Sequence, residues 1–296
     1  MHESSLNEAN ALPAGTRPGA VTLRVRDLEA VARFYRDVLG LRVRSEIGPG
    51  DGPAVALGTS ARTLVRLEPG ARQLADRAAP GLYHLALLLP DRPALGAWLR
   101  HAAQAGTPLQ GAADHGVSEA VYLADPEGNG VEVYRDRPRA GWEVDGDGVR
   151  MVTEPLDAAA VLASAAGAWS GAPAGTVMGH VHLQVADLGR ARDFYQRALG
   201  FPVTNDRFPG ACFLGAGGYH HHLGLNTWGT RPGAARSEGA AGLAALELRL
   251  PTLEDVAATA SRLRATGWQG RREDRTLVTQ DADGVEVRVR AADDEG

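Results

Sequence analysis

Cysteine is almost absent from this chain of 296 residues, which contains only Cys212. A single thiol excludes a disulfide within the chain, and it also excludes a zinc cluster built from cysteines. Cys212 lies in a short strand-like segment, where a cysteine ordinarily serves as a small packing residue. We therefore interpret Cys212 as part of a hydrophobic core.

Long apolar runs and a strong net charge are also missing. The longest apolar stretches, such as Leu85–Leu89, are much too short to cross a bilayer. The first residues lack the basic start and the apolar centre of a signal peptide. The formal net charge of -5 gives no reason to expect nucleic acid or a membrane surface as a partner. These features favour a cytoplasmic enzyme acting on a small molecule, and they leave open whether the chain forms a homo-oligomer.

What the chain does contain is an internal repeat. The segment Val25–Leu28 aligns with Val185–Leu188, and the same alignment matches Phe34-Tyr35 to Phe194-Tyr195. An alternating apolar pattern typical of a half-buried strand precedes each segment, and apolar residues at helical spacing follow it. Short strand-like segments come next, so each unit has the order strand, helix and three strands.

A second pair of units is similar to the first. One begins at Gly81–Leu85 and the other at Gly242–Leu246, and each continues into a helical pattern. They end in the related segments Pro126–Val133 and Asp283–Val287. Internal repetition on this scale is strong evidence about architecture. The chain therefore contains four predicted βαβββ modules, at residues 20–68, 82–135, 178–228 and 242–290.

The other segments precede or connect these modules. Residues 1–19 are polar and rich in proline and glycine, so we expect a flexible tail. Residues 137–177 form a linker whose length suits a crossover, with one short predicted helix near Leu156–Ala165. The predicted fold class is α+β, with one module pair in residues 20–136 and another in residues 178–290.

Three of the nine histidines are adjacent, at His220, His221 and His222. Successive side chains of a strand point to opposite faces, so in a strand His221 would face away from the other two. On these residues alone, a functional site enclosed by the sheet and a polar strand edge are equally good interpretations.

The four modules, the segments Val185–Leu188 and Phe194-Tyr195, and the module ending Asp125–Glu132 resemble the vicinal oxygen chelate superfamily. This superfamily contains glyoxalases, bleomycin resistance proteins and extradiol dioxygenases. Within it, the four-module length and the segments Ser118–Pro126 and Tyr219–Trp228 are most similar to catechol 2,3-dioxygenases. The resemblance implies two curved mixed sheets with helices on their outer faces. The reaction must be argued from the site, because one fold serves many functions.

In this superfamily the metal ligands lie on the first strand of one module and on the first and last strands of the module paired with it. The corresponding first-strand positions here are Ala20, His84, His180 and Ala245, and the matching last-strand carboxylates are Glu132 and Glu286.

The resemblance therefore implies that His84, Glu132 and His180 are the metal ligands. Two histidines and one carboxylate with open positions suit non-haem Fe(II), with Mn(II) as a substitute. This set requires module two to pair with module three, and modules one and four to form a second pair without a metal. His182 shares the strand face of His180, so alternation alone allows either histidine to reach the metal.

The resemblance also implies the groups that perform the chemistry. Ring cleavage of an aromatic 1,2-diol needs a base near the metal, and the corresponding histidine of the family matches His221. Strand alternation instead directs His220 and His222 towards the cleft, so the choice among the three stays open. Tyr122 matches a tyrosine that hydrogen-bonds the substrate oxygen, and His115 matches a histidine near the substrate hydroxyl. The expected substrate-binding residues are His182, His220 and His222.

The implied function is a metal-dependent extradiol dioxygenase that uses O2 to open the ring of a catechol-type diol. The alternatives on this fold are a glyoxalase-type metal-dependent isomerase or lyase, and a small-molecule-binding resistance protein. Glyoxalase chemistry usually requires a second carboxylate or a glutamine among the ligands, whereas the third module offers histidines. Bound iron would favour oxygen chemistry, zinc or nickel the isomerase, and no metal a binding protein.

Overall fold

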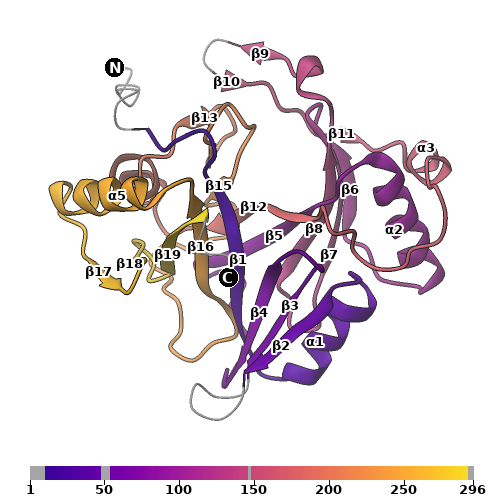
Figure 1. Ribbon diagram of the computed structural model, residues 1–296, viewed down its shortest axis with the longest axis horizontal. Helices are drawn as coiled ribbons and strands as arrows, with labels where there is room; N and C mark the ends of the chain where they lie inside the picture. Colours follow the sequence, from indigo (N-terminus) through magenta and orange to yellow (C-terminus); the bar gives the residue numbers. More distant parts are fainter. Residues whose placement is uncertain (1–10, 48–53, 146–147, 293–296) are drawn as a thin grey trace.

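The computed structural model describes residues 11–47, 54–145 and 148–292, and it contains two large mixed β-sheets with helices around them (Figure 1). The strands of the first sheet are, in spatial order, β17 (Gly270–Glu273), β18 (Thr276–Gln280), β19 (Glu286–Ala291), β16 (Gly242–Leu250), β1 (Arg17–Val25), β4 (Thr63–Pro69), β3 (Ala54–Gly58) and β2 (Arg42–Ile47). The strands of the second sheet are β11 (Glu154–Pro155), β6 (Gly111–Asp114), β7 (Ser118–Ala124), β8 (Gly130–Asp136), β5 (Gly81–Leu88), β12 (Val177–Gln184), β15 (Leu223–Asn226), β14 (Ala211–Leu214) and β13 (Val203–Asn205).

The remaining elements are short strands and helices. A small separate ribbon pairs β9 (Val144–Asp145) with β10 (Gly148–Val149). The helices are α1 (Leu28–Asp37), α2 (Arg92–Gln104), α3 (Ala158–Ala163), α4 (Leu188–Arg192), α5 (Leu253–Ala265), the 3-10 turn η2 (Arg139–Gly141) and the π-helix η3 (Asp193–Ala198). In Figure 1, α1, α2 and α5 lie at the periphery of the molecule, outside the sheets. This architecture confirms the predicted α+β class.

Each sheet combines one module from the first half of the chain with one module from the second half. The antiparallel pairing of β5 with β12 joins the second module to the third. The antiparallel pairing of β1 with β16 joins the first module to the fourth. The crossover in the chain therefore brings the first strands of modules two and three side by side at the centre of one sheet.

The turn from the first strand into the helix is built in a similar way in all modules. Asp27, Asp91 and Asp187 are N-caps, and each carboxylate accepts a hydrogen bond from the backbone N–H three residues later. In the fourth module, Thr252 and Asp255 form a capping box at the start of α5. These caps explain why the repeated aspartates in the sequence mark the starts of helices.

The two sheets share one hydrophobic core. Leu23 on β1, Leu85 on β5, Val181 on β12 and Leu246 on β16 are all fully buried in the same cluster. Cys212 belongs to this cluster too, and burial raises the pKa of its thiol to about 11. Within the described ranges, the helices are too short or too polar to span a membrane.

The flexible tail predicted for residues 1–19 ends earlier in the chain than expected. Strand β1 begins at Arg17, and Leu12 packs into the core while its N–H donates to the carbonyl of Gly200 at 2.8 Å. Burial of Leu12 fixes this segment because apolar area is removed from water. Residues 1–10 of the expected tail lie outside the described ranges.

Candidate metal centre

Five side chains of the second sheet share one face because of strand register. Ala86 on β5 is opposite Glu132 on β8 and opposite His180 on β12. His84 lies two residues from Ala86, and it is opposite His182 on β12. Residues opposite one another, or two apart on a strand, point to the same side of a sheet. The small side chain of Ala86 leaves space between the ligand candidates on its neighbouring strands.

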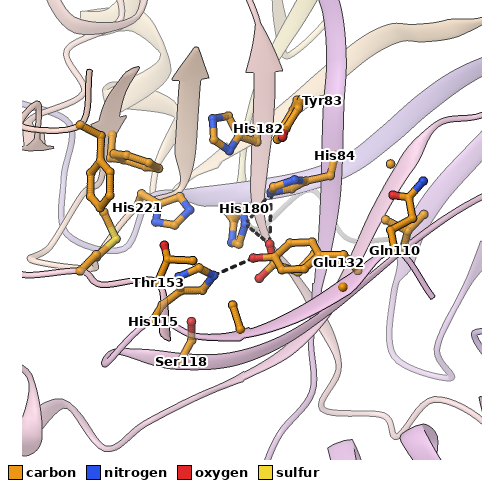
Figure 2. A pocket seen from close by; sticks show the side chains of 18 of the residues that line it. Tyr83, His84, Gln110, His115, Ser118, Glu132, Thr153, His180, His182 and His221 are labelled. Atoms are coloured by element: carbon orange, nitrogen blue, oxygen red, sulfur yellow. Dashed lines mark hydrogen bonds and ion pairs between the residues drawn. The ribbon is translucent and has the colours of Figure 1, made fainter. Parts of the chain in front are cut away.

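The imidazoles of His84 and His180 meet the carboxylate of Glu132 at this face. The Nε2 atoms of the two histidines are 3.3 Å apart, and each lies 3.1 Å from Oε2 of Glu132. Ligand atoms about 2.1 Å from a metal, the length of zinc–imidazole bonds, and at right angles to one another would be about 3.0 Å apart. The three atoms therefore have the spacing of one triangular face of an octahedron, and the residues fit a metal ion (Figure 2).

The carboxylate of Glu132 is almost completely buried, with 2% of its surface exposed. Burial alone would raise its pKa, but the charges and hydrogen bonds of His180 and His84 outweigh burial and lower the pKa well below the usual value. Burial lowers the pKa of His180, which favours the neutral ring that binds metals. Nδ1 of this ring is buried and has no hydrogen-bond partner in the part of the chain that the structure describes, whereas Nε2 faces Glu132 and is the nitrogen available to a metal.

A cavity of about 540 Å³ opens onto His84, Glu132 and His180. Its walls include several aromatic side chains, namely Tyr83, Tyr122, Phe208, Phe213 and Trp228. Its volume is in the ordinary range for small-molecule sites, which are mostly apolar with a few polar groups that fix orientation. The cavity therefore suits a ligand with an aromatic ring and polar groups directed at the metal ligands.

His115 and Tyr122 both line this cavity. Nδ1 of His115 is 2.7 Å from the carbonyl of Val152, so Nδ1 carries the proton. In the neutral ring Nε2 is then an acceptor, and the Tyr122 hydroxyl donates to it at 2.7 Å. Burial raises the pKa of Tyr122 well above its usual value, so the tyrosine keeps its proton.

His182 lines the cavity between the metal ligands and the aromatic wall. Its ring lies edge-on to those of His84, Phe213 and Trp228, with centroids 5.0, 5.6 and 5.6 Å away. Its Nε2 is buried and has no hydrogen-bond partner among the described residues. A Cβ atom at Gly224 would lie only 2.7 Å from the His182 ring, so this glycine makes room for the imidazole.

The three adjacent histidines are not in a regular strand, which corrects the expected alternation. β15 begins only at Leu223, after the histidines. His221 lines the cavity, and the centroid of its ring lies 4.2 Å from that of His180 (Figure 2). His220 and His222 do not line it. The cavity therefore gives no support to their expected role in binding substrate: His220 is fully buried, with its Nδ1 2.8 Å from Nδ1 of His221, and Nδ1 of His222 accepts a hydrogen bond from the backbone N–H of Ala216.

The fourth module has no ligand at either corresponding position. Asp125 and Asp281 form equivalent turns, because each carboxylate accepts from the backbone N–H groups two and four residues later. Counting from these turns, Glu132 corresponds to Arg288. The match of Glu286 to Glu132 was therefore displaced by two residues, and the ion pair of Glu286 with Arg288 replaces a metal ligand there.

Sequence reasoning missed part of the cavity wall. Met151, Val152 and Thr153 belong to the linker, yet they close the cavity and provide the carbonyl that orients His115. No motif in the linker indicates this contact. Trp228 and Phe213 were also missed as wall residues, although both lie close to the histidine segment in the sequence.

Comparison with known proteins agrees with this geometry. Residues 17–133 and 177–291 match the Glyoxalase/Bleomycin resistance protein/Dioxygenase superfamily. The chain is 40% identical over 258 residues to a catechol-2,3-dioxygenase of Bacillus subtilis, covering 86% of this chain and 89% of that protein. The chain belongs to the Glyoxalase/Bleomycin resistance protein/Dioxygenase superfamily, as its motifs predicted.

Solved structures of low sequence identity share the fold. A putative dioxygenase from Bacillus subtilis superimposes with a TM-score of 0.67 at 15% identity, covering 95% of this chain and 86% of that one. Glyoxalase I from Zea mays superimposes with a TM-score of 0.58 at 19% identity, covering 93% and 92%. At these identities the similarity establishes the fold and leaves the reaction to the site.

Proposed function

We propose that the protein is an extradiol dioxygenase that uses Fe(II) and O2 to open the ring of a catechol-type diol beside its two hydroxyls. The observation that carries this proposal is the cluster of two histidines and one carboxylate, exposed on one side to a cavity with aromatic walls. This ligand set with open positions suits non-haem Fe(II), and Mn(II) is the substitute. The relative of 40% identity bears the name of this activity, which supports the same assignment.

His84, Glu132 and His180 would hold the ion, which supplies a site where the diol and O2 are brought together. Phe213 and Trp228 line the cavity, where they would pack against the substrate ring as it displaces water. Excluding water strengthens each polar contact inside the cavity.

The proton chemistry is assigned to a histidine and a tyrosine that line the cavity. His221 takes a proton from one diol hydroxyl, because burial and the neighbouring His180 and His220 lower its pKa well below the usual value and keep the ring neutral. On diol binding, the single hydroxyl proton of Tyr122 is redirected from His115 to the other diol oxygen, where negative charge develops. His182 is the remaining substrate-binding candidate, because its Nε2 has no hydrogen-bond partner among the described residues and would face the substrate.

The direct test is turnover of catechol by the full-length chain reconstituted with Fe(II) under air. We expect a yellow ring-opened product and consumption of one O2 per diol. His84→Ala should abolish product formation and reduce the iron bound per chain. His101→Ala is the matched control, because His101 lies on α2 and bonds the carbonyl of Asp37 outside the cavity. A chain that binds zinc or nickel tightly and isomerises a thiohemiacetal without using O2 would contradict the proposal.

A further inference from the structure

A hydrogen-bonded chain leads from the cavity to the protein surface through His221. Nδ1 of His221 lies 2.8 Å from Nδ1 of His220. Nε2 of His220 lies 3.0 Å from Oδ1 of Asp136, at the end of β8. His220 is fully buried, whereas the Asp136 side chain is 26% exposed. The three groups form a row from cavity to solvent.

With both imidazoles neutral, counting protons along this row fixes the tautomer of each ring. An ionised carboxylate only accepts hydrogen bonds, so His220 must donate to Asp136 through Nε2–H. A neutral imidazole has one N–H, so Nδ1 of His220 is an acceptor. The hydrogen bond between the two Nδ1 atoms then requires His221 to donate through Nδ1–H. Nε2 of His221, the other ring nitrogen, is left as an unprotonated acceptor for the cavity.

We propose that Asp136 and His220 are positioning residues that hold His221 in the tautomer whose unprotonated Nε2 faces the substrate. The proposal rests on the acid–base role of His221 in the proposed function. A base in the other tautomer would present an N–H to the diol and could not accept its proton. The arrangement is therefore required for His221 to act in the first proton transfer.

The surroundings of this row keep the two histidines in place. The Tyr219 hydroxyl also donates to Oδ1 of Asp136, at 3.2 Å, and it lies 2.8 Å from the hydroxyl of Tyr134. Trp142, from the linker, packs on His220 with ring centroids 5.2 Å apart, and Arg139 lies over the Trp142 ring. Asp136, Arg139 and Glu132 are charged groups of this cluster, and burial raises the pKa of both tyrosines well above their usual values.

The same contacts accommodate the proton once it arrives. When the diol hydroxyl loses H⁺ to Nε2 of His221, that ring carries a proton on both nitrogens and a positive charge. Its Nδ1–H continues to donate to His220, whose Nε2–H continues to donate to Asp136. No bond in the row has to be broken, and the carboxylate charge partly offsets the new imidazolium.

The tautomer can be read directly by ¹⁵N NMR of histidine side chains in the full-length chain loaded with Zn(II), a diamagnetic ion. Signals of His221 are assigned by their loss in His221→Gln. We expect His221 to be protonated on Nδ1 and unprotonated on Nε2. In Asp136→Asn the amide can donate as well as accept, so the fixed tautomer should be lost. Tyr219→Phe, which removes the other hydrogen bond to Asp136 and leaves the carboxylate, should preserve the His221 tautomer.

Kinetics of the Fe(II) enzyme provide the second measurement. A positioned general base contributes about 10²–10⁴-fold to rate, so kcat of Asp136→Asn should fall at least about 10-fold with little change in KM for the diol. His220→Phe keeps a ring of similar shape and should show the same loss. Asp76→Asn, a surface carboxylate paired with Arg231, is the control that should leave kcat unchanged.

Two results would overturn the inference. One is a wild-type His221 protonated on Nε2. The other is an Asp136→Asn variant with an unchanged tautomer and unchanged kcat. If the protein instead fails to cleave any catechol, the NMR measurement still tests the Asp136–His220–His221 row, and only the proposed function fails.

Discussion

Replacing Tyr122 by phenylalanine removes one oxygen atom from the cavity and leaves the ring that lines it. The hydroxyl lies 2.7 Å from Nε2 of His115. A hydrogen bond to a charged oxygen contributes about 1.5–3 kcal/mol. Since about 1.36 kcal/mol corresponds to a factor of ten, kcat/KM for catechol should fall by about 10- to 150-fold.

The assay is the rate of yellow product formation at saturating O2, with iron per chain measured on the same sample. Tyr122 is not a ligand, so iron content should be unchanged in Tyr122→Phe. Tyr35→Phe is the matched control, because Tyr35 lies on α1 and its buried hydroxyl has no hydrogen-bond partner in the described structure. A Tyr122→Phe variant within twofold of the wild-type kcat/KM would refute the role assigned to this hydroxyl.

Three further predictions concern the scaffold around the site. Gly224→Ala places a Cβ 2.7 Å from the His182 ring, so it should destabilise the fold by about 1–3 kcal/mol in urea unfolding and raise KM for the diol. An unchanged KM would show that His182 does not bind the substrate. Glu119→Ala removes a buried carboxylate that pairs with Arg92 and Arg135 and leaves the charges of these arginines uncompensated. The free energy of unfolding should therefore fall by about 3–5 kcal/mol, and a loss below about 1 kcal/mol would contradict this. Burial opposes ionisation of Glu119, but the arginines outweigh it and lower its pKa, so its contribution is present above the unfolded pKa of about 4.3 and is lost as pH falls through the lower folded value. The difference in unfolding free energy between wild type and Glu119→Gln should therefore shrink below about pH 4.3, and a difference that grows on acidification would reverse the assigned sign.

The repeated modules could be predicted from the sequence because their signals are local. Asp27 and Asp187 cap helices in equivalent turns, and alternating apolar residues mark the strands before them. The resemblance to a known superfamily implied the histidine and carboxylate positions, and in the structure strand register places His84, Glu132 and His180 on one face because β5 and β12 are adjacent.

Other features depend on backbone geometry that local patterns do not contain. Alternation failed for His220–His222 because the chain enters β15 only after them, so the period of two does not apply. The residues around Glu286 resemble those around Glu132, and this similarity concealed an alignment error of two residues. A shift of two residues keeps a side chain on the same face of the strand, so the alternation of polar and apolar residues does not reveal it. The contact of Val152 with His115 joins the linker to β6 and its following turn, and such long-range loop packing has no sequence period.

The proposed function requires that His84, Glu132 and His180 hold an iron ion to which the diol binds. An anaerobic crystal structure with Fe(II) and catechol tests it most directly. We expect one ion bound by Nε2 of both histidines and a carboxylate oxygen of Glu132, with both catechol oxygens on the ion and the ring against Phe213 and Trp228. An ion held by other side chains, or a catechol bound away from the ion, would contradict it.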